Sequence, residues 1–273
     1  MPKTIDYSVA FELGMMQEFS TRFSNTAVSR AAKGGLSALM PKSVPAFARE
    51  GAEIHVWRIG LGGDGPADAE RMLTLTEIRR ADKFAFERDR NRFLHARVAL
   101  RHILAHYLDT EPRRLPIRLG AYGKPYLAGG STLGFNLSHS DDLGLLAIGH
   151  AANIGIDIEI LKPLTNVKRL ALSVFSPVEY QAFDLLPDDA LLLPFFRCWT
   201  RKEAYLKAIG SGLTITPDSI TVGIGSEKAR INVKGAHGVS FVEVATFVQD
   251  DDCIASLAVA GGYSRCRVFG YAP

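Results

Sequence analysis

The chain has 273 residues, of which 47% are hydrophobic and 22% are charged, and its formal net charge at pH 7 is +3. This length suffices for one large domain or two of ordinary size, and the composition is that of a soluble globular protein. The small net charge argues against nucleic-acid binding, but it is compatible with a modest cationic site for an anionic small molecule.

The cysteines and the apolar segments exclude further classes of protein. The three cysteines show no Cys-x-x-Cys spacing, which argues against a disulfide framework or a zinc site. No apolar run reaches the roughly 18 residues that a membrane helix needs. Because the N-terminus does not resemble a signal peptide, we expect a cytoplasmic protein that does not enter a membrane.

Residues 1–52 are low in charge and rich in Ser, Ala and Gly, and we expect them to form a partly ordered N-terminal extension. Five large apolar residues recur there at roughly helical spacing: Phe11, Met15, Met16, Phe19 and Phe23. They predict one short amphipathic helix, either loosely attached or packed on the main body.

The folded core is expected to begin with a strand at residues 54–59, where apolar and polar residues alternate. A helical region then starts at Leu75, with Thr74 or Thr76 as its N-cap. Helical periodicity over residues 89–108 predicts a long amphipathic helix. Short strands are expected at residues 117–119, 133–136 and 143–149.

A second series of elements with a similar plan begins with a strand at residues 154–160. Helices are predicted near residues 167–173 and 177–186, and a long helix at 195–209 ends at Gly210, where a left-handed residue is favoured. The last sixty residues alternate as in an antiparallel sheet. From this element order we predict an α+β fold of two similar halves, 53–152 and 153–273, each a long helix packed on a small antiparallel sheet.

The strand at residues 154–160 and the helix at 195–209 carry the candidate chemistry. The strand alternates isoleucine with polar or very small residues, so Asp157 and Glu159 lie side by side on one face, where Gly155 leaves room. On the helix, Glu203 and Lys207 share a face at i, i+4. Three carboxylates and a lysine suit a divalent cation that holds phosphate oxygens, although solvated acids and a surface ion pair would give the same pattern.

These segments resemble a known family. Gly155-Ile156-Asp157-Ile158-Glu159, followed by Trp199-x-x-Lys202-Glu203-Ala204-x-x-Lys207-Ala208, is similar to the paired signature of the 4′-phosphopantetheinyl transferases. Gly123-Lys124-Pro125-Tyr126-Leu127 and Phe135-Asn136-Leu137-Ser138-His139-Ser140 match the upstream motifs of the long, Sfp-type branch. The four motifs occur in the family's order, and the resemblance covers roughly residues 80–213.

The resemblance implies a pseudo-dimer with its active site in the cleft between the halves. It also implies that Asp157, Glu159 and Glu203 ligate Mg²⁺ and that Lys207 lies against a diphosphate oxygen. Either Glu203 or a metal-bound water would accept the proton of the attacking hydroxyl. Trp199 is expected to pack the helix onto the core.

The resemblance assigns a second group of residues to coenzyme A (CoA). Ser138 and His139 are expected near its 3′-phosphate, and Lys124, in a turn that aims it outward, at a phosphate or at the adenine side. Arg80 and Arg92 are the nearest matches to the family's basic CoA contacts, whereas Glu77 stands where the family often has another basic residue.

Other interpretations of these residues stay open. Gly-x-Ser-x-Gly is absent, which argues against Ser138 as a hydrolase nucleophile with His139 as its base, but a structural histidine is possible. A plain solvated turn lysine is the alternative for Lys124, although the CoA contact is the preferred interpretation.

The implied activity is Mg²⁺-dependent transfer of 4′-phosphopantetheine from CoA to a serine of an apo acyl or peptidyl carrier protein, giving the holo-carrier and adenosine 3′,5′-bisphosphate. We expect a monomer. The alternative is a degenerate CoA-binding or carrier-binding module without transferase activity. A phosphotransferase that uses nucleoside triphosphates is disfavoured, because the chain has no Gly-x-x-x-x-Gly-Lys loop. Whether fatty-acid, polyketide or nonribosomal peptide synthesis is served stays open.

Overall fold

The computed structural model describes most of the chain after the N-terminal extension. The described residues are 44–47, 52–151, 153–211, 214–235, 238–249 and 252–271. The helix expected between Phe11 and Phe23 lies outside them.

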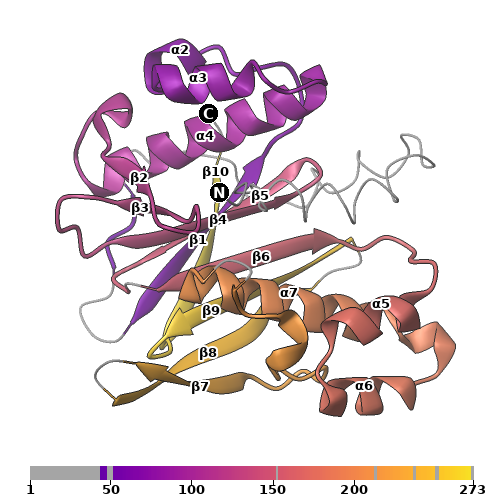
Figure 1. The fold of residues 1–273 in the computed structure, drawn as a ribbon. Coiled ribbons are helices and arrows are strands. Elements are labelled where there is room, and N and C mark those ends of the chain that lie inside the picture. The colour runs from indigo at the N-terminus through magenta and orange to yellow at the C-terminus, as the bar shows by residue number, and fades with distance from the viewer. Residues whose placement is uncertain are drawn as a thin grey trace, which may run out of the picture.

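The first half of the structure is a four-stranded sheet covered by helices. Its strands follow the order β10-β1-β5-β4, in which β1 is antiparallel to β5, β5 is antiparallel to β4, and β10 is parallel to β1. The elements are β1 (Glu53–Gly60), α2 (Ala69–Met72), α3 (Leu75–Ala81), α4 (Glu87–Tyr107), the 3-10 helix η2 (Pro112–Arg114), β2 (Ile117–Leu119), β3 (Pro125–Leu127), β4 (Gly134–Ser140) and β5 (Leu143–Gly149). Strands β2 and β3 form a separate two-stranded sheet. Figure 1 shows α4 lying across the first sheet, with α2 and α3 above it.

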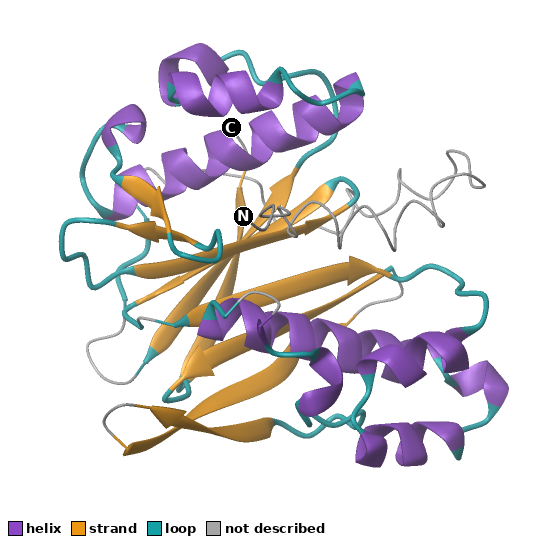
Figure 2. Ribbon diagram, viewed as in Figure 1, coloured by secondary structure: helices purple, strands orange, loops and turns teal. Residues whose placement is uncertain are grey.

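The second half repeats the combination of a long helix and a four-stranded sheet, here in the order β6-β9-β8-β7 with antiparallel pairs throughout. Its elements are β6 (Ile154–Ile160), α5 (Val167–Val174), α6 (Pro177–Asp184), η3 (Asp188–Ala190), α7 (Leu192–Ile209), η5 (Pro217–Ser219), β7 (Ala229–Gly235), β8 (Gly238–Gln249), β9 (Cys253–Ala260) and β10 (Arg265–Tyr271). Figure 2 shows the helices gathered on the outer sides of the two groups of strands. The α+β class predicted from the sequence is therefore confirmed.

The ends of the helices follow the local signals in the sequence. Thr74 begins α3 in a capping box, in which its side chain accepts from the Glu77 amide and the Glu77 carboxylate accepts from the Thr74 amide. Ser176 and Glu179 form the same arrangement at the start of α6. Helix α7 ends at Gly210, whose φ of 69° is the left-handed conformation that the sequence predicted there.

The last strand departs from the predicted division at residues 152 and 153. Strand β10 does not extend the antiparallel sheet formed by β7, β8 and β9, but pairs in parallel with β1 in the first half. Tyr271, at the end of β10, is buried in the apolar core between α4 and the first sheet. Alternating residues can serve any sheet edge, so the sequence pattern did not show which edge β10 joins.

Three apolar layers hold the molecule together. One lies between α4 and the first sheet and is built around Trp57 and Leu100. Another lies between α7 and the second sheet and includes Phe195 and Phe196. The third lies between the two sheets, where Ile156 of β6 and Val56 of β1 are fully buried. This third layer holds the two halves face to face and places β6 at their junction.

Edge strands β4 and β6 meet at that junction through side chains rather than through a backbone ladder. The Ile156 amide donates to Asn136 Oδ1 at 2.8 Å, and the Ile160 amide donates to Ser140 Oγ at 3.1 Å. Polar side chains of β4 therefore satisfy backbone donors of β6, which an unpaired edge would leave exposed. In the described part of the chain, no helix is long and apolar enough to cross a membrane.

Candidate active site

Strand β6 presents one face to the other sheet and its opposite face to α7. Ile154, Ile156 and Ile158 are buried in the layer between the sheets. On the opposite face, a Cβ added to Gly155 would lie 1.9 Å from the carbonyl oxygen of Ala204 and 2.4 Å from the amide nitrogen of Ala208. The backbone of α7 thus rests directly on β6 at Gly155. The space that we expected beside the acids is filled by this helix, which brings Lys207 close to Asp157.

Asp157, Lys207 and Ser138 form a hydrogen-bonded triangle at the junction of the halves. Lys207 Nζ donates to Asp157 Oδ1 at 2.7 Å and to Ser138 Oγ at 2.9 Å. The Ser138 hydroxyl in turn donates to Asp157 Oδ1 at 2.9 Å. Only 5% of the Asp157 side chain is exposed, compared with 28% for Lys207. Solvent therefore reaches this ion pair mainly from the lysine side.

Glu159 lies beside the triangle on the same face of β6. Its Oε2 accepts from Ser140 Oγ at 2.9 Å and its Oε1 accepts from Trp199 Nε1 at 3.1 Å. Burial, followed by the charge of Asp157, raises the pKa of Glu159 to about 8. Two neighbouring, largely buried carboxylates favour an added positive charge, because a cation stabilises both ionised forms.

Trp199 combines the packing role that the sequence predicted with a polar contact. Its ring packs against the apolar core of the second half while its indole nitrogen bonds Glu159. The tryptophan of the signature therefore also orients one of the two acids.

Glu203 lies one helical turn before Lys207 and is partly buried. Among the described residues, no three His, Cys, Asp or Glu side chains converge as ligands of a single ion. The structure therefore brings together Asp157 and Glu159 but does not place Glu203 with them in a closed set of ligands. The donor chemistry of the pair fits Mg²⁺, which is commonly held by one or two carboxylates together with phosphate oxygens and water.

Alternate residues of β4 line the acid face of β6, and sequence reasoning identified only one of them. Asn136, Ser138 and Ser140 are spaced two apart and bond the Ile156 amide, Asp157 and Glu159 respectively. Ser138, which we expected at the 3′-phosphate of CoA, lies against the acids instead. His139 follows it on the opposite face of the strand and is exposed. The period-two spacing of the three polar residues was the signal for this role.

Lys124 is held inside the junction rather than aimed outward as predicted. Its Nζ donates to the carbonyl oxygens of Ile154 at 3.0 Å and Ala208 at 2.9 Å. Burial lowers its pKa to about 8. Carbonyls in the last turn of a helix lack helical partners and attract cations, which explains why the ammonium lies at the end of α7. Lys124 thereby links the first half to both elements that carry the candidate site.

Lys202, the other lysine of the signature, is fully buried in the second half. It forms an ion pair with Glu179 Oε2 at 2.6 Å and donates to the carbonyls of Pro217 and Ile220. Although burial opposes it, Lys202 holds the pKa of Glu179 below its usual value. This pair fixes α7 against α6 and the residues at and after η5. Lys202 therefore helps to position α7, which carries Lys207.

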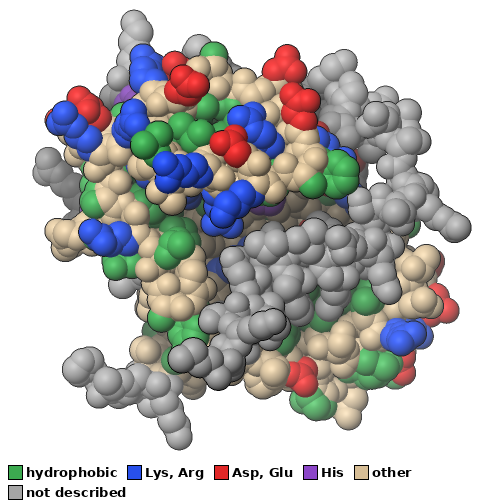
Figure 3. Space-filling model, turned by 45° about the horizontal axis from the view of Figure 1, so that its top comes forward, with side chains coloured by type: hydrophobic (Ala, Val, Ile, Leu, Met, Phe, Trp, Pro, Cys, Tyr) green, Lys and Arg blue, Asp and Glu red, His purple; other side chains and the backbone are tan. Residues whose placement is uncertain are grey.

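The basic residues of the first half have mixed surroundings. Arg80 is exposed and lies over the ring of Phe93, 5.5 Å from its centroid. Arg92 Nε donates to Asp142 Oδ1 at 2.7 Å. Figure 3 shows several Lys and Arg side chains, interspersed with Asp and Glu, on the upper part of the face in view, which the first half forms. Exposed cations such as Arg80 attract anionic ligands.

Glu77 has a structural explanation for its negative charge. Its carboxylate caps α3 and also forms ion pairs with Arg97 and Arg101 of α4. Burial opposes ionisation, but Arg97 and the Thr74 cap outweigh it and lower the pKa of Glu77. Glu77, which stands where the family often has a basic residue, thus joins α3 to α4.

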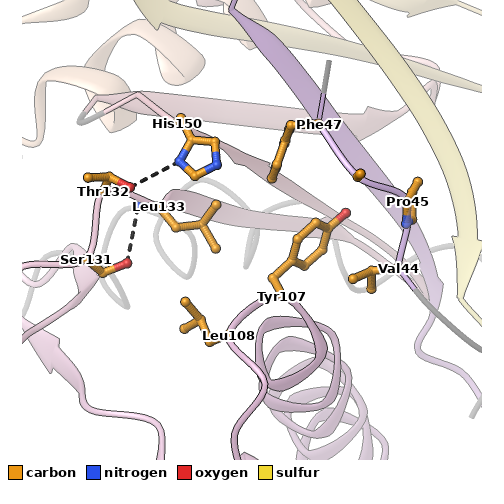
Figure 4. A pocket seen from close by; sticks show the side chains of 10 residues that line it. Val44, Pro45, Phe47, Tyr107, Leu108, Ser131, Thr132, Leu133 and His150 are labelled. Atoms are coloured by element: carbon orange, nitrogen blue, oxygen red, sulfur yellow. Dashed lines mark hydrogen bonds between the residues drawn. The ribbon is translucent and has the colours of Figure 1, made fainter. Parts of the chain in front are cut away.

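Two cavities in the first half lie apart from the acids. The smaller, of about 240 Å³, is lined by residues of the 44–47 segment, the end of α4 and the loop before β4. Figure 4 shows Phe47, Tyr107 and His150 around it, with His150 bonded to Thr132 at 3.1 Å. The larger cavity, of about 670 Å³, lies beside α2 and the C-terminal part of α4. None of the acids or lysines of the junction lines either one.

Comparisons with known proteins agree with this geometry. A family profile described as the 4′-phosphopantetheinyl transferase superfamily matches residues 153–253, and one described as 4′-phosphopantetheinyl transferase, N-terminal, matches residues 67–150. The chain is 39% identical over 228 residues to the 4′-phosphopantetheinyl transferase HetI of Nostoc sp., an alignment that covers 81% of this chain and 90% of the relative. The chain belongs to the 4′-phosphopantetheinyl transferase superfamily.

More distant superfamily members align over most of their length as well. A phosphopantetheinyl transferase of Thraustochytrium sp. is 31% identical over 225 residues, covering 75% of this chain and 78% of the relative. A 4′-phosphopantetheinyl transferase of Bacillus subtilis is 28% identical over 200 residues, covering 71% and 87%. The first profile contains β6 and α7, so the match includes Asp157, Glu159 and Lys207.

Proposed function

We propose that the protein transfers 4′-phosphopantetheine from CoA to a serine hydroxyl of an apo acyl or peptidyl carrier protein. The new bond joins the serine oxygen to the phosphorus on the pantetheine side of the CoA diphosphate. The bond from that phosphorus to the bridging oxygen breaks, and adenosine 3′,5′-bisphosphate leaves. The observation that carries the proposal is the cluster of Asp157, Glu159 and Lys207 at the junction, in a chain of this superfamily.

Asp157 and Glu159 would hold a Mg²⁺ ion together with oxygens of the diphosphate. When bound, the ion would neutralise the charge that develops on the diphosphate as the bond breaks. The raised pKa of Glu159 supports this assignment, because a buried acid pair gains from a cation between its members.

Lys207 would contribute the second positive charge. Its side chain is 28% exposed, and its ammonium already bonds the Ser138 hydroxyl as well as Asp157, so it is placed to meet a diphosphate oxygen that approaches from solvent. Preorganised donors of this kind stabilise developing negative charge because they need little rearrangement during the reaction. Ser138 would hold the side chains of Asp157 and Lys207 in their relative positions, because it bonds both.

Glu203 would accept the proton of the attacking serine, or complete the ligands of the ion. Both roles need a carboxylate on the face of α7 that carries Lys207, and the i, i+4 spacing meets this need. The variant Glu203→Gln separates them. A ligand role predicts recovery of the rate at high Mg²⁺, whereas a base role predicts an unrecovered loss of about 10²–10⁴-fold.

The nucleotide end of CoA would lie toward the first half. Arg80, Arg92 and His139 are the proposed contacts for its phosphates. Their surroundings support this, because Arg80 and His139 are exposed and the Arg92 side chain is 18% exposed. Lys124 would act through the protein, by holding α7, or exchange one of its carbonyl partners for a CoA oxygen.

The decisive experiment is incubation of the purified protein with CoA, Mg²⁺ and an apo carrier protein, followed by intact mass measurement of the carrier. Transfer would add one phosphopantetheine group to the carrier, and Asp157→Ala should slow it by about 10²–10³-fold. Carriers from fatty-acid, polyketide and nonribosomal peptide synthesis should be compared. Binding of CoA or carrier without any mass gain across all three would refute the proposal and leave a binding module.

A further inference from the structure

Two histidines lie one turn apart near the C-terminal end of α4. The acids of the junction are on a different element, β6. The ring centroids of His102 and His106 are 4.8 Å apart. His102 Nδ1 lies 3.0 Å from the hydroxyl of Tyr271, near the end of β10, and His106 Nδ1 lies 2.8 Å from the carbonyl oxygen of His102. Each ring is thus oriented by a hydrogen bond at the same nitrogen.

These hydrogen bonds leave a definite atom on each ring. A carbonyl oxygen only accepts, so Nδ1 of His106 carries the proton and Nε2 carries the lone pair. The Tyr271 hydroxyl can accept from His102 Nδ1 in the same way. Within the described residues, neither Nε2 atom forms a hydrogen bond. Metal-binding histidines in proteins have this arrangement, in which the second nitrogen donates to an orienting oxygen.

Both histidines line the cavity of about 670 Å³ beside α2, so a ligand can reach them. His106 is exposed and His102 is partly exposed. The spacing also fits a shared ion. With metal–nitrogen bonds of about 2.0–2.1 Å, each ring centroid lies roughly 3 Å from the ion, so centroids 4.8 Å apart can both bind it.

We propose that His102 and His106 form the protein half of a binding site for a divalent transition-metal ion such as Zn²⁺, Ni²⁺ or Cu²⁺. Imidazole nitrogen suits these ions, whereas Mg²⁺ prefers oxygen. Because no third His, Cys, Asp or Glu converges with the pair among the described residues, water or an external donor completes the coordination. The site is separate from the acids at the junction of the halves.

The charged side chains that line the same cavity are two acids, Asp109 and Glu111, and two bases, Arg71 and Arg113. Since Tyr271 orients His102, a bound ion would also fasten the end of β10 to α4.

The test is calorimetric titration of the full-length protein with Zn²⁺ in excess Mg²⁺, which occupies the carboxylate site. One Zn²⁺ event per chain is expected, and it should be lost in His106→Ala. His95→Ala is the matched control, because His95 lies on the same helix and its Nε2 bonds the Asp64 carbonyl at 2.7 Å. Tyr271→Phe keeps both ligands but removes the orienting hydroxyl, so the Zn²⁺ affinity should fall about 10–100-fold.

Thermal unfolding gives a second readout. Zn²⁺ should raise the melting temperature of the wild type and of His95→Ala but not that of His106→Ala, because binding to the folded state alone stabilises it. Unchanged Zn²⁺ binding in His106→Ala would overturn the proposal. So would a binding event that survives His106→Ala and disappears in Cys266→Ser, since it would assign the ion to the partly exposed thiol.

Discussion

Replacing Gly155 by alanine tests how closely the candidate site depends on the contact between β6 and α7. The added Cβ would lie 1.9 Å from the carbonyl oxygen of Ala204, whereas real Cβ contacts are essentially never shorter than 3.0 Å. The obstructing atom belongs to the helix backbone, so no side-chain rotation relieves the clash. Helix α7 must therefore move away from β6 by about 1 Å, since packed interiors have no spare volume.

That displacement separates the two sides of the site. Asp157 lies on β6 and Lys207 on α7, and their 2.7 Å contact lengthens as the helix moves. A shift of about 1 Å in a catalytic arrangement can cost about 10²-fold in rate. Overpacking of a core also costs roughly 1–3 kcal/mol of stability, so the variant should fold but unfold at lower temperature. We expect Gly155→Ala to be folded and to transfer phosphopantetheine about 100-fold more slowly.

Carrier mass measurements give the rate and thermal unfolding gives the stability. Gly270→Ala is the matched control, because it also adds a methyl group to a strand but meets nothing within 4 Å. Ala204→Gly in the Gly155→Ala background should not restore the rate, since the clash is with a carbonyl oxygen. Rescue by that second change, or wild-type turnover of Gly155→Ala, would refute the reasoning.

Ser138→Ala removes one hydrogen bond to each of two charged groups, worth about 1.5–3 kcal/mol each, so it should lower the stability as well as slow transfer by roughly 10–100-fold. An unchanged rate would show that Asp157 and Lys207 hold each other without it. Lys124→Met tests a pH dependence. Because burial lowers the pKa of Lys124 to about 8 from 10.5, the unfolded chain binds more protons than the folded chain between these values. The wild type should therefore gain stability relative to Lys124→Met as pH rises from 8 toward 10.5, measured by urea unfolding, and a constant difference would contradict the assignment. Lys202→Met should lower the free energy of unfolding in urea by about 3–5 kcal/mol, because it leaves Glu179 buried and charged. Adding Glu179→Gln to this variant should recover part of that loss. Wild-type stability of Lys202→Met would contradict a structural role.

Local patterns in the sequence predicted the elements that carry the site. The isoleucine alternation of β6 and the period of α7 are short-range signals, and the structure has both elements where they were expected. Their contact is less visible in sequence, because Gly155 reads equally well as space for a ligand and as space for a helix. Only the packed structure shows that the helix occupies it.

The polar partners across the junction were harder to predict, because they depend on which edge strands meet. Ser138 bonds a residue 19 positions along the chain, and Lys124 bonds Ala208, 84 positions away. A pattern read within one element carries no information about such pairs. Lys202 illustrates the same limit, since its neighbours in the signature do not reveal that its charge is buried against Glu179.

The return of β10 to the first sheet affects how the protein must be made. Strand β1 gains its outer neighbour only after β10 has been synthesised, so the first sheet waits, with one edge open, through synthesis of the second half. An open edge can pair with other chains, which makes this interval the most aggregation-prone part of biogenesis. For the same reason, a split of the gene between residues 152 and 153 would separate β10 from its sheet. Only a permuted chain, in which β10 precedes β1, would let the first half complete its own sheet.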